Sequence, residues 1–383
     1  MSAAPATSPL TETIVITGIG MVTPLGFDPA AVLEGIKAGT TAIAAPRNFD
    51  TSLFACPVCA SIEDFRPHDF IAEAKLIRLM SRDAQLAAAA AHLTLADAGL
   101  ESDRFHAPEE IGLFGATGMA GLPVREIAPL LKASTDAAGR FDMGKFGEEG
   151  LRGVSPILSF KILSNMPVCF ASICENIQGP NAVYTPWEGH GARAIEAGIL
   201  ALLDGDANCV LVGASDVKTH ELAFLALEQL GLFESWNRSG AGLAPGEGAV
   251  FLVLETAATA LIRGAKTYAR ISNWNFQCQQ GTPEAEVLQS AIHNLATPQI
   301  GAVVAAANSD PVLDLAEAEA LILTKTDSLP RLSPKQHLGD LFAAAAPLQV
   351  AIAALLAKQL GQTVLANCFG HGTEQAAFLL EPL

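Results

Sequence analysis

Short segments that are almost wholly apolar alternate along this chain with longer alanine-rich segments. Residues 13–20, 111–118 and 248–255 have the composition of strands buried on both faces, and residues 84–99 have the spacing of a buried helix that ends at a glycine. This alternation predicts an α/β fold in which helices cover both faces of the sheets. It begins again after Glu255, so we predict two similar halves, residues 13–255 and 256–383, behind a flexible tail over residues 1–12.

The composition limits the class of protein. Half of the residues are hydrophobic and 16% are charged, which excludes intrinsic disorder. The formal net charge of −17 argues against a nucleic-acid or anionic-membrane partner. We find neither a secretory signal nor an uninterrupted apolar run long enough to span a membrane, so we expect a cytoplasmic protein. The polar, glycine-rich stretch 133–152 predicts a surface excursion.

The sequence contains none of the common metal-binding, cofactor-binding or serine-nucleophile motifs that we searched for. Seven cysteines are present, and the pair Cys56 and Cys59 lies in an apolar run, residues 53–62, that we expect to be a strand with reduced, structural thiols. The eight histidines show no metal-ligand spacing, so no metal is predicted. Dinucleotide, phosphate-loop and serine-elbow motifs are absent.

Five segments, in order along the chain, carry a resemblance to a known family. They are IVITGIGMVTPLG (14–26), SFKILSNMPVCFASICENIQGPN (159–181), LVGASD (211–216), GLAPGEGAVFLVLE (242–255) and NCFGHGTEQAAFLL (367–380). Together they resemble the β-ketoacyl-ACP synthase family. The resemblance implies a thiolase-like fold, two similar halves in an α-β-α-β-α layering, and no cofactor.

The residues that this family uses for condensation are missing. The resemblance places the nucleophilic Cys at Trp187 or, with one extra residue in the turn, at Glu188, and the two histidines at Ala306 and Asp340. The gating Phe of the C-terminal segment corresponds to His371. Scaffold residues are kept, namely Lys335, Glu317, Gly246, Glu247 and Gly248. We therefore expect no independent condensing activity.

The resemblance then implies the role of a chain-length factor. Such a subunit pairs with an active ketosynthase in type II polyketide or aryl polyene synthesis, and it shapes the acyl tunnel. The implied interface strand is Ala182, Val183, Tyr184 and Thr185, and the implied tunnel residues are Leu122, Val124, Ile127 and Leu131. Because carrier proteins are acidic, we expect acyl carrier protein to bind mainly through the partner subunit.

Other interpretations stay open. Glu188 could work with His190 and Asp340 in a stand-alone decarboxylase or acyltransferase, or simply stabilise the helix dipole. His337 could pair with Asp340, and Trp187 could plug the former pocket. Lys335 and Glu317 could hold the surrounding loops by a salt bridge, and Asp216 could brace the turn after its strand. A third hypothesis is a non-catalytic homodimer that binds an acyl chain.

Overall fold

The computed structural model describes residues 13–100, 105–118, 122–278, 284–295 and 299–383, so the predicted tail over residues 1–12 lies outside the described residues. Its ten strands form one sheet in the order β3-β2-β4-β5-β1-β6-β10-β9-β7-β8. The first half of the chain supplies β1 (Ile14–Val22), β2 (Ile111–Thr117), β3 (Asn181–Tyr184), β4 (Cys209–Val217) and β5 (Glu247–Thr256). The second half supplies β6 (Ala269–Cys278), β7 (Ile300–Val304), β8 (Arg331–Leu332), β9 (Thr363–Cys368) and β10 (Glu374–Glu381).

The two sets of five strands meet at a short seam. Strands β1 and β6 pair at Ile14↔Ile271, Val15↔Arg270 and Ile16↔Ala269 and at no further described residue, whereas β4 and β5 pair along their whole length. The two sets of five strands are therefore joined into one sheet by this short seam. The boundary at residues 255 and 256 is not tested by this pairing and stays a prediction.

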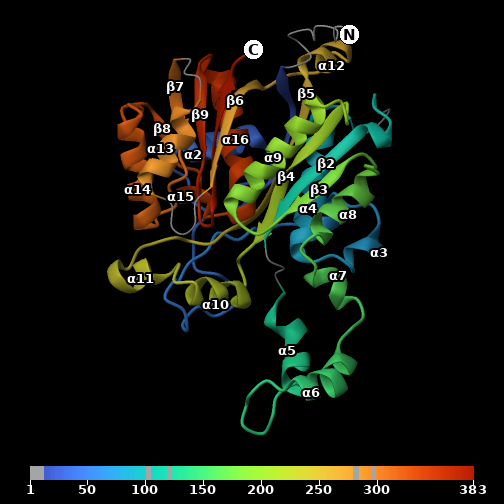
Figure 1. Ribbon diagram of the computed structural model, residues 1–383. Helices are drawn as coiled ribbons and strands as arrows, with labels where there is room; N and C mark the ends of the chain where they lie inside the picture. Colours follow the sequence, from blue (N-terminus) through green and yellow to red (C-terminus); the bar gives the residue numbers. More distant parts are fainter. Residues whose placement is uncertain (1–12, 101–104, 119–121, 279–283, 296–298) are drawn as a thin grey trace, which may run out of the picture.

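Helices form three layers around these strands. In the middle layer, α9 (Glu188–Leu203) and α16 (Ala345–Leu360) share one hydrophobic core with strands of both halves (Figure 1). Outside the first half, α4 (Arg82–Asp97) and α8 (Met166–Glu175) pack on the other face. Outside the second half lie α13 (Ala285–His293) and α14 (Pro311–Leu323). The thiolase-like α-β-α-β-α layering is confirmed.

The remaining helices are short and lie around these layers. They are α2 (Pro29–Lys37), α3 (Ala74–Ile77), α5 (Val124–Ala133), α6 (Met143–Lys145), α7 (Leu158–Ile162), α10 (Glu221–Gln229), α11 (Glu234–Ser239), α12 (Ala257–Ile262) and α15 (Lys335–Leu338). Short 3-10 or π turns cover Pro67–Asp69, Pro108–Glu110, Phe146–Gly150, Leu151–Gly153 and Phe342–Ala344. Helices α5 and α6 project away from the sheet, so the predicted excursion over residues 133–152 is found at the surface (Figure 1).

Two glycines in β1 explain how closely α4 packs on the sheet. A Cβ atom at Gly20 would lie 2.4 Å from the backbone nitrogen of Thr94, and one at Gly18 would lie 2.7 Å from the Thr94 carbonyl oxygen. Both distances are too short for any side chain, so the glycines let an alanine-rich helix lie directly on the strand.

The segment Phe342–Leu360 is long and apolar enough to cross a membrane, with a mean hydropathy of 1.4. Most of it (78%) is buried inside the protein, where α16 packs between the two halves. Its apolar character is thus accounted for by its place in the core.

The strand predicted over residues 53–62 is not formed. This segment makes single bridges at Ala44↔Cys59 and Ala60↔Gly246, because it packs as a loop on an aromatic cluster that contains Phe224 and Phe233. Cys56 and Cys59 are buried, and burial raises their pKa values to about 12 and about 11. None of the seven cysteines forms a disulfide.

Candidate functional site

Helix α9 begins where the resemblance places the nucleophile. Trp187 is its N-cap residue, and Glu188 is its first helical residue. Glu188 is fully buried, while Trp187 is partly buried. A Cβ atom at Gly370 would lie 2.1 Å from Cδ of Glu188, so the glycine loop after β9 closes directly over the carboxylate. The site at the start of this helix is a buried carboxylate that is covered by the backbone at Gly370.

Two cations contact this carboxylate. Nζ of Lys335 lies 3.5 Å from Oε1 of Glu188, and Nδ1 of His371 lies 3.3 Å from the same oxygen. Lys335 also lies 3.1 Å from Oδ2 of Asp340 and donates a 3.0 Å hydrogen bond to the carbonyl of Phe369. Nε2 of His371 lies 3.7 Å from Asp310. We call these five residues, Glu188, Lys335, Asp340, His371 and Asp310, the Glu188 network.

The charged side chains of this network shift one another's pKa values. Burial raises the pKa of Glu188, but Lys335 and His371 outweigh burial and hold it at about 2. Burial lowers the pKa of His371, but Asp310 and Glu188 raise it to about 10. Burial likewise opposes the charge on Lys335, and Asp340 and Glu188 raise its pKa above the ordinary value. At neutral pH Glu188, His371 and Lys335 are therefore charged, and both cations contact the Glu188 carboxylate.

Asp340 takes part through hydrogen bonds as well as charge. Its Oδ2 accepts a 2.7 Å hydrogen bond from Nδ2 of Asn308, and its Oδ1 accepts a 2.8 Å bond from the backbone N–H of Phe342. It therefore ties Lys335 to the turn before α16. Asn308 and Asp310 were missed from the sequence, although they lie in the loop between the apolar strand β7 and helix α14, where polar side chains of α/β folds gather.

Three pairings proposed from the sequence are wrong. Lys335 contacts Glu188 and Asp340 instead of Glu317, whose carboxylate accepts hydrogen bonds from the Ala306 N–H (2.9 Å) and from Nδ2 of Asn367 (2.7 Å). The other two involve histidines. Nδ1 of His190 accepts a 3.2 Å bond from the Trp187 N–H, and Nδ1 of His337 bonds the Thr40 carbonyl at 3.0 Å. Among the described contacts, neither ring meets the carboxylate expected for it.

Trp187 packs against the network from the other side. Its ring lies 6.1 Å from the ring of Phe342 and 6.3 Å from that of His371, and a Cβ atom at Gly372 would come within 2.9 Å of it. An apolar cavity of 220 Å³ adjoins Trp187 and is lined by Pro186, Leu222, Ala223, Ala226, Leu227, Leu230, Lys218 and His220. The indole thus lines this cavity and also packs beside the ionised residues.

The scaffold residues that the chain keeps shape the loop of Asp340. A Cβ atom at Gly246 would lie 2.7 Å from the carbonyl of Leu338, and one at Gly248 would lie 3.0 Å from Leu341. Glu247 is buried, binds Arg82 at 2.6 Å and accepts a 2.7 Å bond from the Ile62 N–H. The two glycines allow the loop of Asp340 to approach strand β5 closely, whereas Glu247 holds Arg82 and Ile62.

Asp216, which we expected to brace the turn after its own strand, contacts Lys218 just after that strand and also a distant segment. It is fully buried at the end of β4, is ion-paired with Lys218 and accepts a 3.3 Å bond from the Ala343 N–H. The segment that it holds is the turn before α16, which is distant in sequence.

None of the tunnel and interface candidates belongs to the Glu188 network, although Thr185 precedes Glu188 by three residues. Leu122 is buried and lines a second cavity of 460 Å³, Val124 and Ile127 are partly buried, and Leu131 is 41% exposed on α5. Ala182, Val183 and Tyr184 belong to β3, which stands at the end of the sheet and pairs with β2 alone, and Thr185 follows it. Their roles stay predictions.

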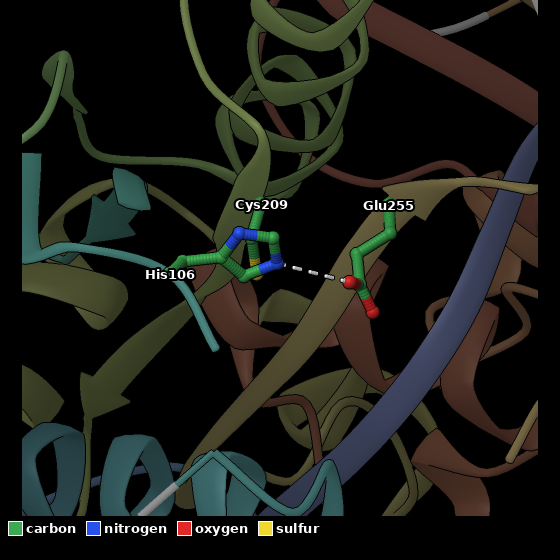
Figure 2. A group of neighbouring side chains, drawn as sticks. All are labelled: His106, Cys209 and Glu255. Atoms are coloured by element: carbon green, nitrogen blue, oxygen red, sulfur yellow. Dashed lines mark hydrogen bonds and ion pairs between the residues drawn. The ribbon is translucent and has the colours of Figure 1, made fainter. Parts of the chain in front are cut away.

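Two groups of side chains have the spacing of metal ligands: Glu188, Asp340 and His371 in the Glu188 network, and His106, Cys209 and Glu255 outside it. Figure 2 shows His106 pointing to Glu255, with Cys209 beside them, and Nε2 of His106 lies 3.3 Å from Oε1 of Glu255. The carboxylate also accepts hydrogen bonds from Arg263 at 2.6–3.0 Å and from Thr17 at 2.6 Å. Arg263 pairs with Glu255 at 2.6 Å, so the burial of this carboxylate is explained by a cation of the chain itself.

Comparison with known proteins agrees with this architecture. The description "Beta-ketoacyl synthase, N-terminal domain" matches residues 11–260. The chain belongs to the beta-ketoacyl synthase family. A relative is the 3-oxoacyl-[acyl-carrier-protein] synthase 2 of Coxiella burnetii, 26% identical in an alignment of 367 positions that covers 89% of this chain and 85% of that protein. The corresponding Staphylococcus aureus synthase is 25% identical in an alignment of 369 positions that covers 90% of this chain and 85% of that protein.

Solved ketosynthase structures show the same fold. The ishigamide ketosynthase/chain length factor superposes with a TM-score of 0.80 at 20% identity, covering 97% of this chain and 99% of the other. A type II polyketide acyl-carrier protein in complex with its ketosynthase, bound to a hexaketide, superposes with a TM-score of 0.74 at 18% identity and the same coverage. The chain is thus a ketosynthase-family protein, similar to condensing enzymes of fatty acid and polyketide synthesis.

Proposed function

We propose that this chain is a non-condensing, chain-length-factor-like subunit that pairs with an active ketosynthase in a type II polyketide or aryl polyene pathway. The observation that carries the proposal is Glu188, which stands at the start of α9 and is held there by Lys335 and His371. A thiolate at a helix start attacks a thioester, whereas a carboxylate with a pKa of about 2 is a poor base and a poor nucleophile.

The other two family positions support the same proposal. Ala306 has no titratable group, and Asp340 is engaged by Lys335, Asn308 and the Phe342 N–H. No imidazole is therefore available at either position to assist decarboxylation or to stabilise an oxyanion. Condensation would have to be catalysed by a partner subunit.

The surface around α5 to α8 is suited to such a partner. Apolar side chains there are unusually exposed, including Phe141 (54%), Met143 (70%), Leu151 (54%) and Ile173 (57%). The free edge of β3 also offers backbone groups without sheet partners. Large exposed apolar surface marks interaction sites, and obligate interfaces bury roughly 2,000–5,000 Å². The net charge of −17 favours docking of acidic carrier protein on the partner.

Co-expression with a ketosynthase encoded beside this chain tests the proposal. We expect a 1:1 complex by size-exclusion chromatography with light scattering, and condensation that depends on the cysteine of the partner. Recovery of this chain without the ketosynthase, at micromolar concentrations of both, would contradict the heterodimer.

One observation favours an alternative, a decarboxylase or acyltransferase. Oε2 of Glu188 is buried and has no hydrogen-bond partner among the described residues, so it could accept a bond from a substrate. Release of CO₂ from malonyl-carrier protein by the isolated chain, lost in Glu188→Gln, would support that function. Isolation of a homodimer with lipid in the 220 Å³ cavity would instead support an acyl-binding protein.

A further inference from the structure

A cysteine, a histidine and a glutamate meet at one end of the sheet. Cys209 begins β4 and is paired in the antiparallel register with Glu255 on β5, so both side chains stand on the same face of the sheet. Nε2 of His106, from the segment before β2, lies 3.3 Å from Oε1 of Glu255. The three ligand atoms lie within 4.8 Å of one another (Figure 2). We call these three residues the His106 group.

The His106 group is closed off from solvent. Cys209 and Glu255 are 0% exposed, and His106 is 3% exposed. The pair with Arg263 accounts for the burial of the carboxylate. The thiol and the imidazole ring beside it add two donor atoms of the kinds that bind transition metals.

The donor set selects the class of cation. One sulfur, one imidazole nitrogen and one carboxylate oxygen are all ligands of Zn²⁺, which binds them at about 2.0–2.3 Å. Mg²⁺ and Ca²⁺ prefer oxygen ligands. Ligand atoms around one Zn²⁺ lie about 3–4 Å apart, so the present separations, within 4.8 Å, would close by side-chain movements of about 1 Å. A thiolate and a carboxylate also carry two negative charges, which match the charge of the ion.

Other side chains hold the carboxylate of Glu255 in place. Its Oε2 accepts hydrogen bonds from Thr17 (2.6 Å) and from Nη2 of Arg263 (2.6 Å), and Nε of Arg263 lies 2.8 Å from Oε1 and 3.0 Å from Oε2. Arg263 is anchored in turn by the Ala98 carbonyl at 2.8 Å. Carboxylates that bind metals are usually oriented by such hydrogen bonds. Oε1, which faces His106, is the oxygen placed to bind the ion.

The other group with the spacing of metal ligands already holds a cation of the chain. Nζ of Lys335 lies 3.5 Å from Glu188 and 3.1 Å from Asp340, so its ammonium group contacts two of the three potential ligands. A metal ion there would have to displace a buried, paired charge. In the His106 group, the hydrogen bonds of Arg263 go to one potential ligand, Glu255.

We propose that His106, Cys209 and Glu255 bind one thiophilic divalent cation, of which Zn²⁺ fits best, and that the ion holds the segment before β2 against strands β4 and β5. Cys209 binds as the thiolate, and its proton passes to solvent. His106 binds through Nε2 with its proton on Nδ1, and nothing is oxidised or reduced. Spacing along the chain gave no sign of this site, because His106 and Glu255 are 149 residues apart. The inference goes beyond the proposed function and holds whether or not the chain binds a ketosynthase.

Titration of the EDTA-treated chain with Zn²⁺ tests the site. Calorimetry should give one ion per chain with a Kd of about 10 μM or tighter. Co²⁺ in place of Zn²⁺ should produce the charge-transfer absorption of a cobalt–thiolate bond. Cys209→Ala should remove this absorption and weaken binding by about 100-fold or more, beyond the cost of losing an outer hydrogen-bond partner. The control Cys368→Ala, at another buried cysteine, should change neither.

Cys56 and Cys59 are the competing ligands for such an ion. Binding that survives in Cys209→Ala but is lost in Cys56→Ala/Cys59→Ala would overturn the proposal, and so would a Kd weaker than about 10 μM. If Cys209→Ala does not fold, X-ray absorption of the zinc-loaded unmodified chain decides the question. One sulfur at about 2.3 Å, with nitrogen and oxygen ligands at about 2.0–2.2 Å, supports the site, and any other number of sulfurs overturns it.

Amide hydrogen exchange tests whether the ion holds the segment before β2. At a Zn²⁺ concentration ten times the Kd, exchange over residues 105–107 should slow by up to roughly tenfold through mass action. The same addition should have no effect in Cys209→Ala. Unchanged exchange in the zinc-loaded unmodified chain would overturn this part of the proposal.

Discussion

Lys335 and Glu188 are both fully buried, and their charged atoms lie 3.5 Å apart although 147 residues separate them in sequence. The pair joins the start of α9 in the first half to α15 in the second. It also sets the electrostatics of the candidate site, because Asp340 shares the same lysine at 3.1 Å. Several predictions concern this pair and its surroundings.

Replacing Lys335 should strongly destabilise the protein. Lys335→Met leaves Glu188 and Asp340 buried without their cation, which costs about 3–5 kcal/mol in the free energy of unfolding. Urea denaturation followed by circular dichroism measures this loss. Lys37→Met, which removes the solvent-exposed pair with Glu34, is the matched control and should change stability little. Equal losses in both variants would show that the network is not a stabilising unit.

His371 should make the free energy of unfolding fall at alkaline pH, and Glu188 should make it fall at acidic pH. The folded pKa of His371, about 10, is above its ordinary 6.5, so its contribution is complete below pH 6.5 and is lost as pH rises toward 10. The folded pKa of Glu188, about 2, is below its ordinary 4.5, so its contribution is present above pH 4.5 and is lost as pH falls toward 2.

The variant His371→Gln tests the loss of stability that we expect at alkaline pH. The difference in unfolding free energy between the unmodified chain and the variant should be a few kcal/mol at pH 6 and should shrink steadily up to pH 10. Denaturant titrations at each pH measure it. A difference that stays constant across this range would mean that His371 is not held in its charged form.

Restoring a cysteine should not restore condensation. Glu188→Cys supplies a thiol at the start of α9, but Ala306 and Asp340 still lack the imidazoles that the family uses. We expect no detectable β-ketoacyl product from acyl and malonyl carrier proteins with this variant alone. The triple variant Glu188→Cys/Ala306→His/Asp340→His is the informative comparison, and product from the single variant would contradict our assignment of the lost sites.

The edge of β3 should govern dimer formation. Tyr184→Asp places a charge on the strand that we expect to meet the partner, so the complex should dissociate. Because Tyr184 is partly buried against the main hydrophobic core, the isolated chain should also lose stability, so dissociation is compared well below its melting temperature. Leu261→Asp is the control, because Leu261 is 73% exposed on α12, which packs on β1 and β5. Sedimentation velocity of the co-expressed complexes distinguishes the two, and dissociation by Leu261→Asp instead would place the interface elsewhere.

Much of the fold could be predicted because the apolar periodicity is local. Strands β1, β2 and β5 and helix α4 coincide with the apolar segments that the sequence shows at residues 13–20, 111–118, 248–255 and 84–99. The predicted strand over residues 53–62 failed for a tertiary reason. Its apolar side chains are buried by Phe224 and Phe233 from other segments, so the backbone has no neighbouring strand with which to pair.

The sequence by itself determined the α/β architecture, the family resemblance, and the loss of Cys and both His residues at the expected positions. Only the tertiary structure decided which charges meet. Lys335 pairs with Glu188 and Asp340, not with Glu317. The histidine that contacts Glu188 is His371, not His190. The physical reason is that ion pairing depends on distances of a few ångströms between segments more than a hundred residues apart, whereas helix and strand formation depends on neighbours along the chain.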